Sequence, residues 1–341
     1  MKRIGFACKW IDFPHQVNGI DKNDDVKQYN TGTTTISWLN RQTKDVAEQR
    51  LWDLMVQNLE ATHKLVKRVG ELDENLRMVR ISSDLLPAFT QDTWSYFWHK
   101  SDVVSYLERH FLAIGDSARR SNVRLSFHPG QFTVLASINP GIVDRSIEEF
   151  EYHASMAAWM GFGKQFQDLK INVHISGKLG PDGIRQAYKR LSPEARNCIT
   201  IENEENSWGL DDCLTLSDII PIVLDVHHFW IREGAYLDPE DARVAQVVDS
   251  WRGIRPTMHY SISREDYLVE HDTMVLPDHK HLLLNGYKKQ KLRAHSDFYW
   301  NTKVSEWALS FLNTHDIMCE SKGKNLASFA LYEQAKKLTL L

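Results

Sequence analysis

Eight short runs of apolar and β-branched residues recur along this 341-residue chain, and they restrict its fold more than any other feature. Between them lie longer stretches whose apolar residues are three and four positions apart, such as 45–69 and 146–161. The predicted strands begin at Arg3, Met78, Val123, Leu169, Cys198, Pro221, Pro256 and Ile317. Alternating strand and helix patterns indicate βα units around a parallel sheet, and eight such units close a barrel. We therefore expect the α/β class, as a single TIM-type (β/α)8 barrel.

The chain offers no sign of a second domain. A single α/β barrel routinely reaches this length, and there is no internal repeat, low-complexity segment or linker rich in Pro, Gly or Ser. We predict one domain over residues 1–341. The long irregular segment 263–293 contains the basic run "KKQKLR" and is predicted to be an insertion after the seventh strand.

Composition excludes several classes of protein. With 42% hydrophobic and 25% charged residues, the chain has enough apolar mass for a large core, and disorder is excluded. No apolar run has the length of a signal peptide or a membrane span, so we expect a cytoplasmic protein without a membrane partner. Cysteine occurs singly, which indicates neither disulfides nor a thiolate zinc site, at Cys8, Cys198, Cys213 and Cys319. Three of the four lie in or beside strand-like runs, where we expect a small, buried, reduced thiol.

Histidines and carboxylates stand at the ends of six successive predicted strands, from the third to the eighth. One such histidine would be weak evidence, because a core imidazole bonded to a carbonyl is common. Six in succession indicate a site, since barrel enzymes build their chemistry at this end of the strands. The candidates are His128, His174, Glu202, Asp225, His228, His259 and Glu320, with His295 in the insertion just beyond the seventh strand.

Imidazole and carboxylate without thiolate suit divalent manganese, zinc or iron. Eight ligands exceed the three or four of one catalytic metal, so we predict two or three ions with Glu202 as the bridge. Asp225 and His228, three residues apart, would serve neighbouring ions. We assign catalysis to Glu202, Asp225, His259 and Glu320.

Phosphodiester hydrolysis is the natural use of such a cluster, because paired ions stabilise both the attacking and the leaving oxygen. The formal net charge of −4 argues weakly against a nucleic-acid partner, but carboxylates that bind divalent ions would reverse the local charge. Neither a GxxxxGK[ST] phosphate loop nor a GxSxG elbow competes with this interpretation.

The ordered segments "RISSDLLP", "LSFHPGQF", "INVHISG", "ITIENEE", "VLDVHHF", "PTMHYS", "LRAHSDF" and "IMCESKGK" resemble the UV damage endonuclease family, metal-dependent barrels related in fold to endonuclease IV and xylose isomerase. The resemblance implies three metal ions, manganese foremost with zinc or magnesium as alternatives, held by the eight residues named above. It also implies incision of damaged double-stranded DNA immediately 5′ to a UV photoproduct, leaving 3′-hydroxyl and 5′-phosphate ends. We expect a monomer.

The resemblance also implies a lesion probe. Residues that match Gln131 and Phe132 enter the duplex in this family, and Phe6 matches a family aromatic near the end of the first strand. Pro129 and Gly130 make a stiff, sharp turn for such a wedge, although Phe132 packed on its own barrel is the alternative. Candidate contacts to the DNA backbone are Lys9, Arg80 and Lys178, and Arg80 could equally be a buried ion-pair partner.

The chain departs from the family pattern at two positions. Thr257 stands where the family usually has a lysine that is described as carboxylated and lies near the metals, and Lys9 lies where relatives often have asparagine. The insertion before His295 is a further difference. Two alternatives therefore stay open: a metal-dependent sugar isomerase or epimerase, and a lesion-binding protein that has lost cleavage.

Overall fold

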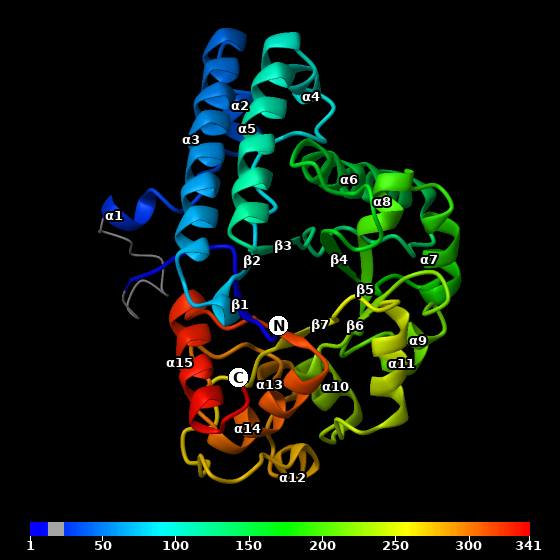
Figure 1. The fold of residues 1–341 in the computed structure, drawn as a ribbon. Helices are drawn as coiled ribbons and strands as arrows, with labels where there is room; N and C mark the ends of the chain where they lie inside the picture. The colour runs from blue at the N-terminus through cyan, green and yellow to red at the C-terminus, as the bar shows by residue number, and fades with distance from the viewer. Residues whose placement is uncertain (13–23) are drawn as a thin grey trace.

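The computed structural model describes residues 1–12 and 24–341, and its eight strands form one parallel sheet around a common centre (Figure 1). Each strand predicted from the sequence is present in a shorter form, so the expected barrel class is confirmed. The strands are β1 (Ile4–Ala7), β2 (Met78–Arg80), β3 (Arg124–Phe127), β4 (Lys170–His174), β5 (Ile199–Glu202), β6 (Ile222–Val223), β7 (Thr257–Tyr260) and β8 (Asp316–Cys319).

The sheet runs in the order β6-β5-β4-β3-β2-β1-β8-β7, and a single bridge brings its two edges together. Asp225, just beyond β6, pairs in parallel with His259 of β7, and the His259 N–H donates to the Leu224 carbonyl over 2.9 Å. The barrel is therefore nearly closed, and the closure itself lies between two candidate metal ligands.

Helices cover the outside of the barrel (Figure 1). They are α1 (Asp24–Lys27), α2 (Ile36–Leu39), α3 (Lys44–Gly70), α4 (Ser95–Trp98), α5 (Ser101–Arg120), α6 (Pro140–Trp159), α7 (Gly180–Tyr188), α8 (Pro193–Cys198), α9 (Leu210–Leu214), α10 (Val226–Glu233), α11 (Ala242–Ser250), α12 (His279–Leu284), α13 (Lys289–Leu292), α14 (Thr302–Ser310) and α15 (Lys324–Lys337), with 3-10 turns at Glu74–Leu76 and Phe311–Asn313. No helix in the described ranges is long and apolar enough to span a membrane.

The two helices predicted from periodicity are α3 and α6. Helix α3 buries Leu51, Met55, Leu59 and Val66, spaced for one face, as the sequence predicts. Helix α6 begins six residues before its predicted start, because the Asn139 side chain accepts the Gly141 N–H and caps it, with Pro140 in the first turn.

The end of the barrel at which the strands begin is closed by buried charge. Asp316, the first residue of β8, has no exposed surface. Its carboxylate accepts from Arg124 Nη1 and from Arg255 Nε, each over 2.7 Å, and from the Arg3 N–H over 2.9 Å. Both carboxylate oxygens thus have charged or backbone donors, so this ion cluster, which we call the floor, holds four strands together.

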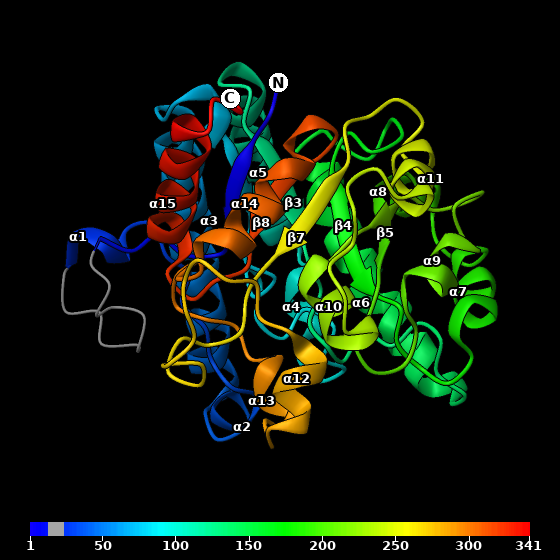
Figure 2. The same cartoon turned by 90° about the horizontal axis from the view of Figure 1, so that it is seen from below.

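The insertion 263–293 lies at the opposite end, towards which the strands point (Figure 2). Its helices α12 and α13 pack through Leu282 and Leu292 onto Trp230 and Ile231 of α10. The Ser263 hydroxyl also donates to the Leu292 carbonyl over 2.5 Å. The insertion is therefore a packed part of the rim.

Candidate metal centre

Each candidate ligand comes from the end of a strand or from the segment that follows it. His174, Glu202 and His259 lie within β4, β5 and β7, and His128 and Glu320 directly follow β3 and β8. Strand termini in a barrel converge on one face, so these side chains come together although they are far apart in the chain.

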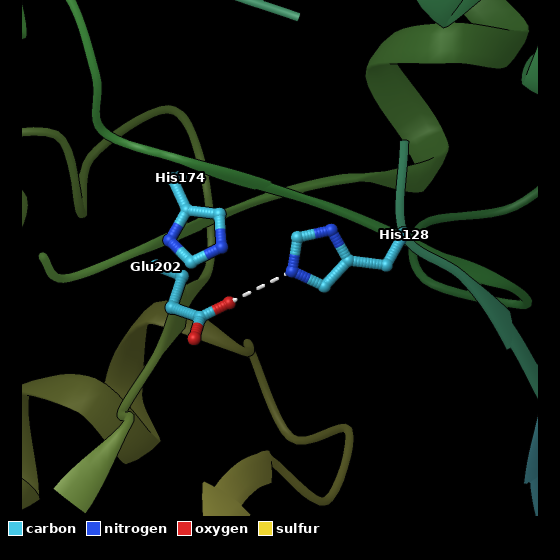
Figure 3. A group of neighbouring side chains, drawn as sticks. All are labelled: His128, His174 and Glu202. Carbon is cyan, nitrogen blue, oxygen red and sulfur yellow. Dashed lines mark hydrogen bonds and ion pairs between the residues drawn. The ribbon is translucent and has the colours of Figure 1, made fainter. Parts of the chain in front are cut away.

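Six of the eight candidates meet in three groups whose donor atoms lie within 4.8 Å of one another. Glu202 belongs to two of the groups. Figure 3 shows the first of them, in which His128 and His174 from neighbouring strands flank the Glu202 carboxylate. The groups are His128, His174 and Glu202; His128, His259 and Glu320; and Glu202, Asp225, His259 and Glu320.

Glu202 lies at the centre of the cluster. Its Oε2 is 3.2 Å from His128 Nε2, and its Oε1 is 3.1 Å from His259 Nδ1. The Asn172 amide also donates to Oε2. Burial by itself raises the pKa of Glu202, but the charges of His259 and His174 outweigh burial and hold the pKa well below its usual value. Glu202 is therefore an ionised carboxylate with neighbours on both oxygens.

The two other carboxylates differ from each other. Burial raises the pKa of Glu320, but His259 and Arg80 outweigh it, so the pKa lies well below the usual value. Burial dominates at Asp225 and raises its pKa well above the usual value, although His228 opposes the shift. Without a cation, a proton on Asp225 would thus relieve the repulsion among the three acids.

Four buried metal-binding atoms of the cluster make no hydrogen bond of acceptable geometry, although the first and last of them lie 3.1 Å apart: Glu202 Oε1, Asp225 Oδ2, His174 Nδ1 and His259 Nδ1. A buried polar atom without a partner costs about 1–3 kcal/mol, so four within one cluster need a ligand. Oxygen and imidazole nitrogen are the donors that divalent manganese and zinc accept. The residues present therefore fit divalent metal ions.

Asp225 and His228 were expected to share a strand end, and this is wrong for His228. The Asp225 side chain accepts the His228 N–H over 2.7 Å and caps α10, so the chain becomes helical before His228. The His228 Nδ1 donates to the Asn203 carbonyl over 2.9 Å, and its Nε2 faces Glu205 Oε2 at 3.5 Å. His228 therefore lies at the edge of the cluster, outside the three groups.

His295 also lies outside the three groups. It follows the insertion and is held by an isolated bridge to Ser263, and its Nδ1 is 2.8 Å from the Glu320 carbonyl. Because this ring nitrogen bonds the backbone of one candidate ligand, Nε2 is the nitrogen left for a metal ion.

Lys170 is a residue of the centre that sequence reasoning missed. It is 3% exposed, and its Nζ lies 2.9 Å from His259 Nε2. Burial lowers the pKa of Lys170 to about 7, against the opposing charge of Glu202. The signal was in the sequence, because Lys170, Asn172 and His174 alternate along β4 and therefore share one face.

The turn after β3 projects as the sequence predicts. The Thr133 N–H donates to the Gly130 carbonyl over 2.9 Å, and Gln131 and Phe132 are exposed, with 86% of Phe132 accessible. The alternative in which Phe132 packs on its own barrel is thus excluded. A cavity of about 170 Å³ on one side of the turn is lined by Gln131, His174, Glu204, Glu205, His228 and Arg293.

The structure corrects two expected DNA contacts, Phe6 and Arg80, because both side chains are engaged within the protein. Phe6 is 1% exposed and packs edge-to-face on Trp10 at 5.9 Å between ring centroids, so it belongs to the core and cannot enter a duplex. The Arg80 side chain is only 15% exposed and pairs with Glu320, which is the ion-pair role left open above. Lys9 and Lys178 are exposed.

Comparison with known proteins identifies the family. The model of the family described as UV-endonuclease UvdE matches residues 3–340. The chain belongs to the UvdE family.

Named relatives agree with this membership. The UV-damage endonuclease of Schizosaccharomyces pombe is 28% identical over 346 residues, covering 96% of this chain and 50% of its own length. The UV DNA damage endonuclease of Bacillus cereus strain B4264 is 24% identical and covers 89% of this chain and 88% of its own. The chain thus spans about half the length of the Schizosaccharomyces pombe relative and most of the Bacillus cereus one.

Solved structures share the UvdE fold. The crystal structure of SacUVDE matches with a TM-score of 0.74 at 22% identity and covers all of both chains. Endonuclease IV from Thermus thermophilus matches with a TM-score of 0.51 at 12% identity, over 81% of this chain and 94% of its own. The expected kinship of fold with endonuclease IV is confirmed.

Thr257 can now be placed within this UvdE barrel. It is 1% exposed and lies two residues before His259, so it shares the inner face of β7. Position 257 offers no amine, but Lys170 brings one to His259 from β4, a strand that does not neighbour β7 in the sheet. Lys170 on β4 therefore places beside His259 the amine that Thr257 on β7 cannot supply.

Proposed function

We propose that this chain is a metal-dependent DNA repair endonuclease that incises the phosphodiester bond immediately 5′ to a UV photoproduct, leaving 3′-hydroxyl and 5′-phosphate ends. The observation that carries the proposal is the set of four buried donor atoms without hydrogen bonds at the catalytic end of a UvdE-family barrel. The names of the relatives supply the substrate class.

The proposed centre holds three divalent ions, manganese foremost, on the eight candidate ligands. Such ions supply Lewis acidity, which activates a water nucleophile and stabilises charge on the phosphodiester oxygens. Glu202 would bridge, since its two oxygens face different histidines. Arg80 keeps Glu320 ionised, and Lys170 fixes the ring of His259.

Gln131 and Phe132 are proposed to probe the lesion. A stacked base resists removal by a few kcal/mol, and less where pairing is already damaged, so a wedge on a rigid turn selects damaged sites. The turn suits this role because its tip is exposed while Thr133 at its base is buried. Lys9 and Lys178, exposed at the same end of the barrel, are proposed to contact the backbone.

The test uses a labelled duplex that carries one photoproduct and the metal-loaded protein. We expect a single nick next to the lesion, lost with chelator and in the Glu202→Gln variant. Glu333→Gln, on the exposed side of α15, removes the same charge and should leave nicking unchanged. Nicks at undamaged sites, or turnover of sugars without DNA cleavage, would contradict the proposal.

A second variant separates probing from chemistry. Gln131→Ala together with Phe132→Ala should reduce the preference for damaged over undamaged duplex by about tenfold or more, on the scale of one stacking contact, with unchanged metal content. Loss of metal in this variant would contradict the assigned role.

A further inference from the structure

Charge is segregated along the insertion. Residues 263–278 carry five carboxylates and one cation, whereas residues 279–293, which we call the basic arm, carry five cations and no carboxylate. This local excess occurs in a chain whose formal net charge is −4. A concentrated basic segment on an otherwise acidic protein suits a polyanion that binds at one place.

Contacts with Glu205 place the basic arm at the edge of the metal centre. The Lys289 Nζ donates to the Glu205 carbonyl over 3.1 Å, and the Arg293 Nε pairs with Glu205 Oε1 over 3.2 Å. The other carboxylate oxygen of Glu205 faces His228 at 3.5 Å. A phosphate bound by the arm would therefore lie close to the metal ligands.

The basic arm and the turn after β3 flank one cavity. Arg293 and Gln131 both line the space of about 170 Å³, which His174 and His228 also line. A duplex that places a lesion at Gln131 and Phe132 therefore has the arm within reach on the other side of the cavity.

The arm is held in place before any partner binds. Leu282 and Leu292 are buried against α10, and the Lys288 N–H donates to the Tyr267 hydroxyl over 2.8 Å. Lys291 lies over the Tyr267 ring at 5.2 Å from its centroid. A packed scaffold lowers the entropy lost when its cations bind, so this segment differs from a solvated charge run.

Three cations of the arm are available. Lys280, Lys288 and Lys291 are exposed, and in the part of the chain that the structure describes no carboxylate lies within 4.0 Å of their amino groups. Arg293 is half-exposed beside its single carboxylate. The three lysines can therefore bind phosphate without first breaking an ion pair.

We propose that the basic arm is a phosphate clamp, which contacts the backbone of double-stranded DNA across the centre from Gln131 and Phe132. The inference rests on the proposed function, because it takes DNA as the substrate. Contacts to phosphate position a duplex without reading its sequence, so the arm supplies affinity and register and leaves the choice of lesion to the turn.

The test compares two triple variants of the metal-loaded protein. One carries Lys280→Gln, Lys288→Gln and Lys291→Gln, and the control carries Lys64→Gln, Lys67→Gln and Lys337→Gln. The control lysines are exposed near the ends of α3 and α15, towards the floor. Binding to undamaged duplex is measured against salt concentration, and nicking of damaged duplex is measured with the protein in saturating excess.

We expect the affinity of the arm variant to depend less steeply on salt. The magnitude of the slope of log K against log[salt] should fall by about 2–3, since each phosphate contact contributes about 0.9. In the control variant the magnitude of the slope should fall by less than the value for one phosphate contact. The rate of nicking at saturating protein should stay within about twofold of the parent in both variants, because all of the DNA is then bound and positioned. Equal slopes in the parent and the arm variant, or equal effects of the two variants, would overturn the clamp. A parent that binds DNA through the arm but never nicks would instead refute the proposed function.

Discussion

The two ends of this barrel both bury carboxylates, and they satisfy them in opposite ways. At the floor, the Asp316 carboxylate accepts hydrogen bonds from Arg124, from Arg255 and from the Arg3 backbone N–H, so neither of its oxygens lacks a partner. At the other end, Glu202 Oε1 and Asp225 Oδ2 are buried without a hydrogen bond. The floor is complete as a protein structure, whereas the metal centre is complete only with cations.

Three strands carry both ends. Arg124 and His128, Arg255 and His259, and Asp316 and Glu320 are each four residues apart. An even spacing keeps both members on the inner face, about 13 Å apart along an extended strand. The difference between the ends therefore comes from the choice of side chains, and the following four predictions separate stability at the floor from metal binding at the centre.

The largest effect is expected from Asp316→Asn. This change leaves the partly buried side chains of Arg3, Arg124 and Arg255 without their counter-charge, and breaking a buried ion pair destabilises a protein by about 3–5 kcal/mol. Chemical unfolding should show that loss, while the folded variant keeps the metal content of the parent. A stable variant that has lost its metal would reverse the assignment of the two ends.

Removal of the metal ions should destabilise the protein through the metal centre and not through the floor. Ions that bind only the folded chain stabilise it by about 4 kcal/mol when present at a thousand times their dissociation constant. Chelation should therefore lower the melting temperature of the parent by more than that of Glu202→Gln. An equal shift in both proteins would show that the ions bind elsewhere.

Lys170→Met should weaken metal binding by about tenfold at pH 8, within the 10–100-fold range for such supporting partners. Above its pKa of about 7 the amine is uncharged and accepts the His259 Nε2 proton, which leaves Nδ1 for the metal. Methionine cannot accept that proton, whereas Lys170→Gln should recover part of the affinity. Calorimetric titration would measure all three proteins, and unchanged affinity in the methionine variant would remove Lys170 from the centre.

The smallest effect is expected on the pH dependence of stability, through His315, which directly precedes Asp316 of the floor. Burial, and then the charge of Arg255, lowers the pKa of His315 to about 3 from a reference of 6.5. The unfolded chain thus takes up a proton that the folded chain refuses, so the parent loses stability as pH falls from 6.5 towards 3. His315→Gln should lose about 1–2 kcal/mol less between pH 7 and 4.5, in chelator. Parallel pH profiles would contradict this.

The strands and most of the centre could be predicted because their signals are local. Each strand is a short apolar run, and His128, His174, Glu202 and Glu320 stand where those runs end. The helical start at Val226, before His228, was missed, since the Asp225 cap follows an apolar run that resembles a longer strand.

Side-chain direction could not be predicted where both faces of a strand are buried. All four residues of β1 are buried, so alternation did not show that Phe6 faces the core. The partners of Lys170 and Arg80 lie on distant strands, which only the closed barrel brings together.

The most direct test of the account is the metal content of each protein after dialysis against manganese. We predict two to three ions per chain in the parent and in folded Asp316→Asn, and at most one in Glu202→Gln. The absence of metal from the parent, or the same content in all three proteins, would contradict a cation cluster centred on Glu202.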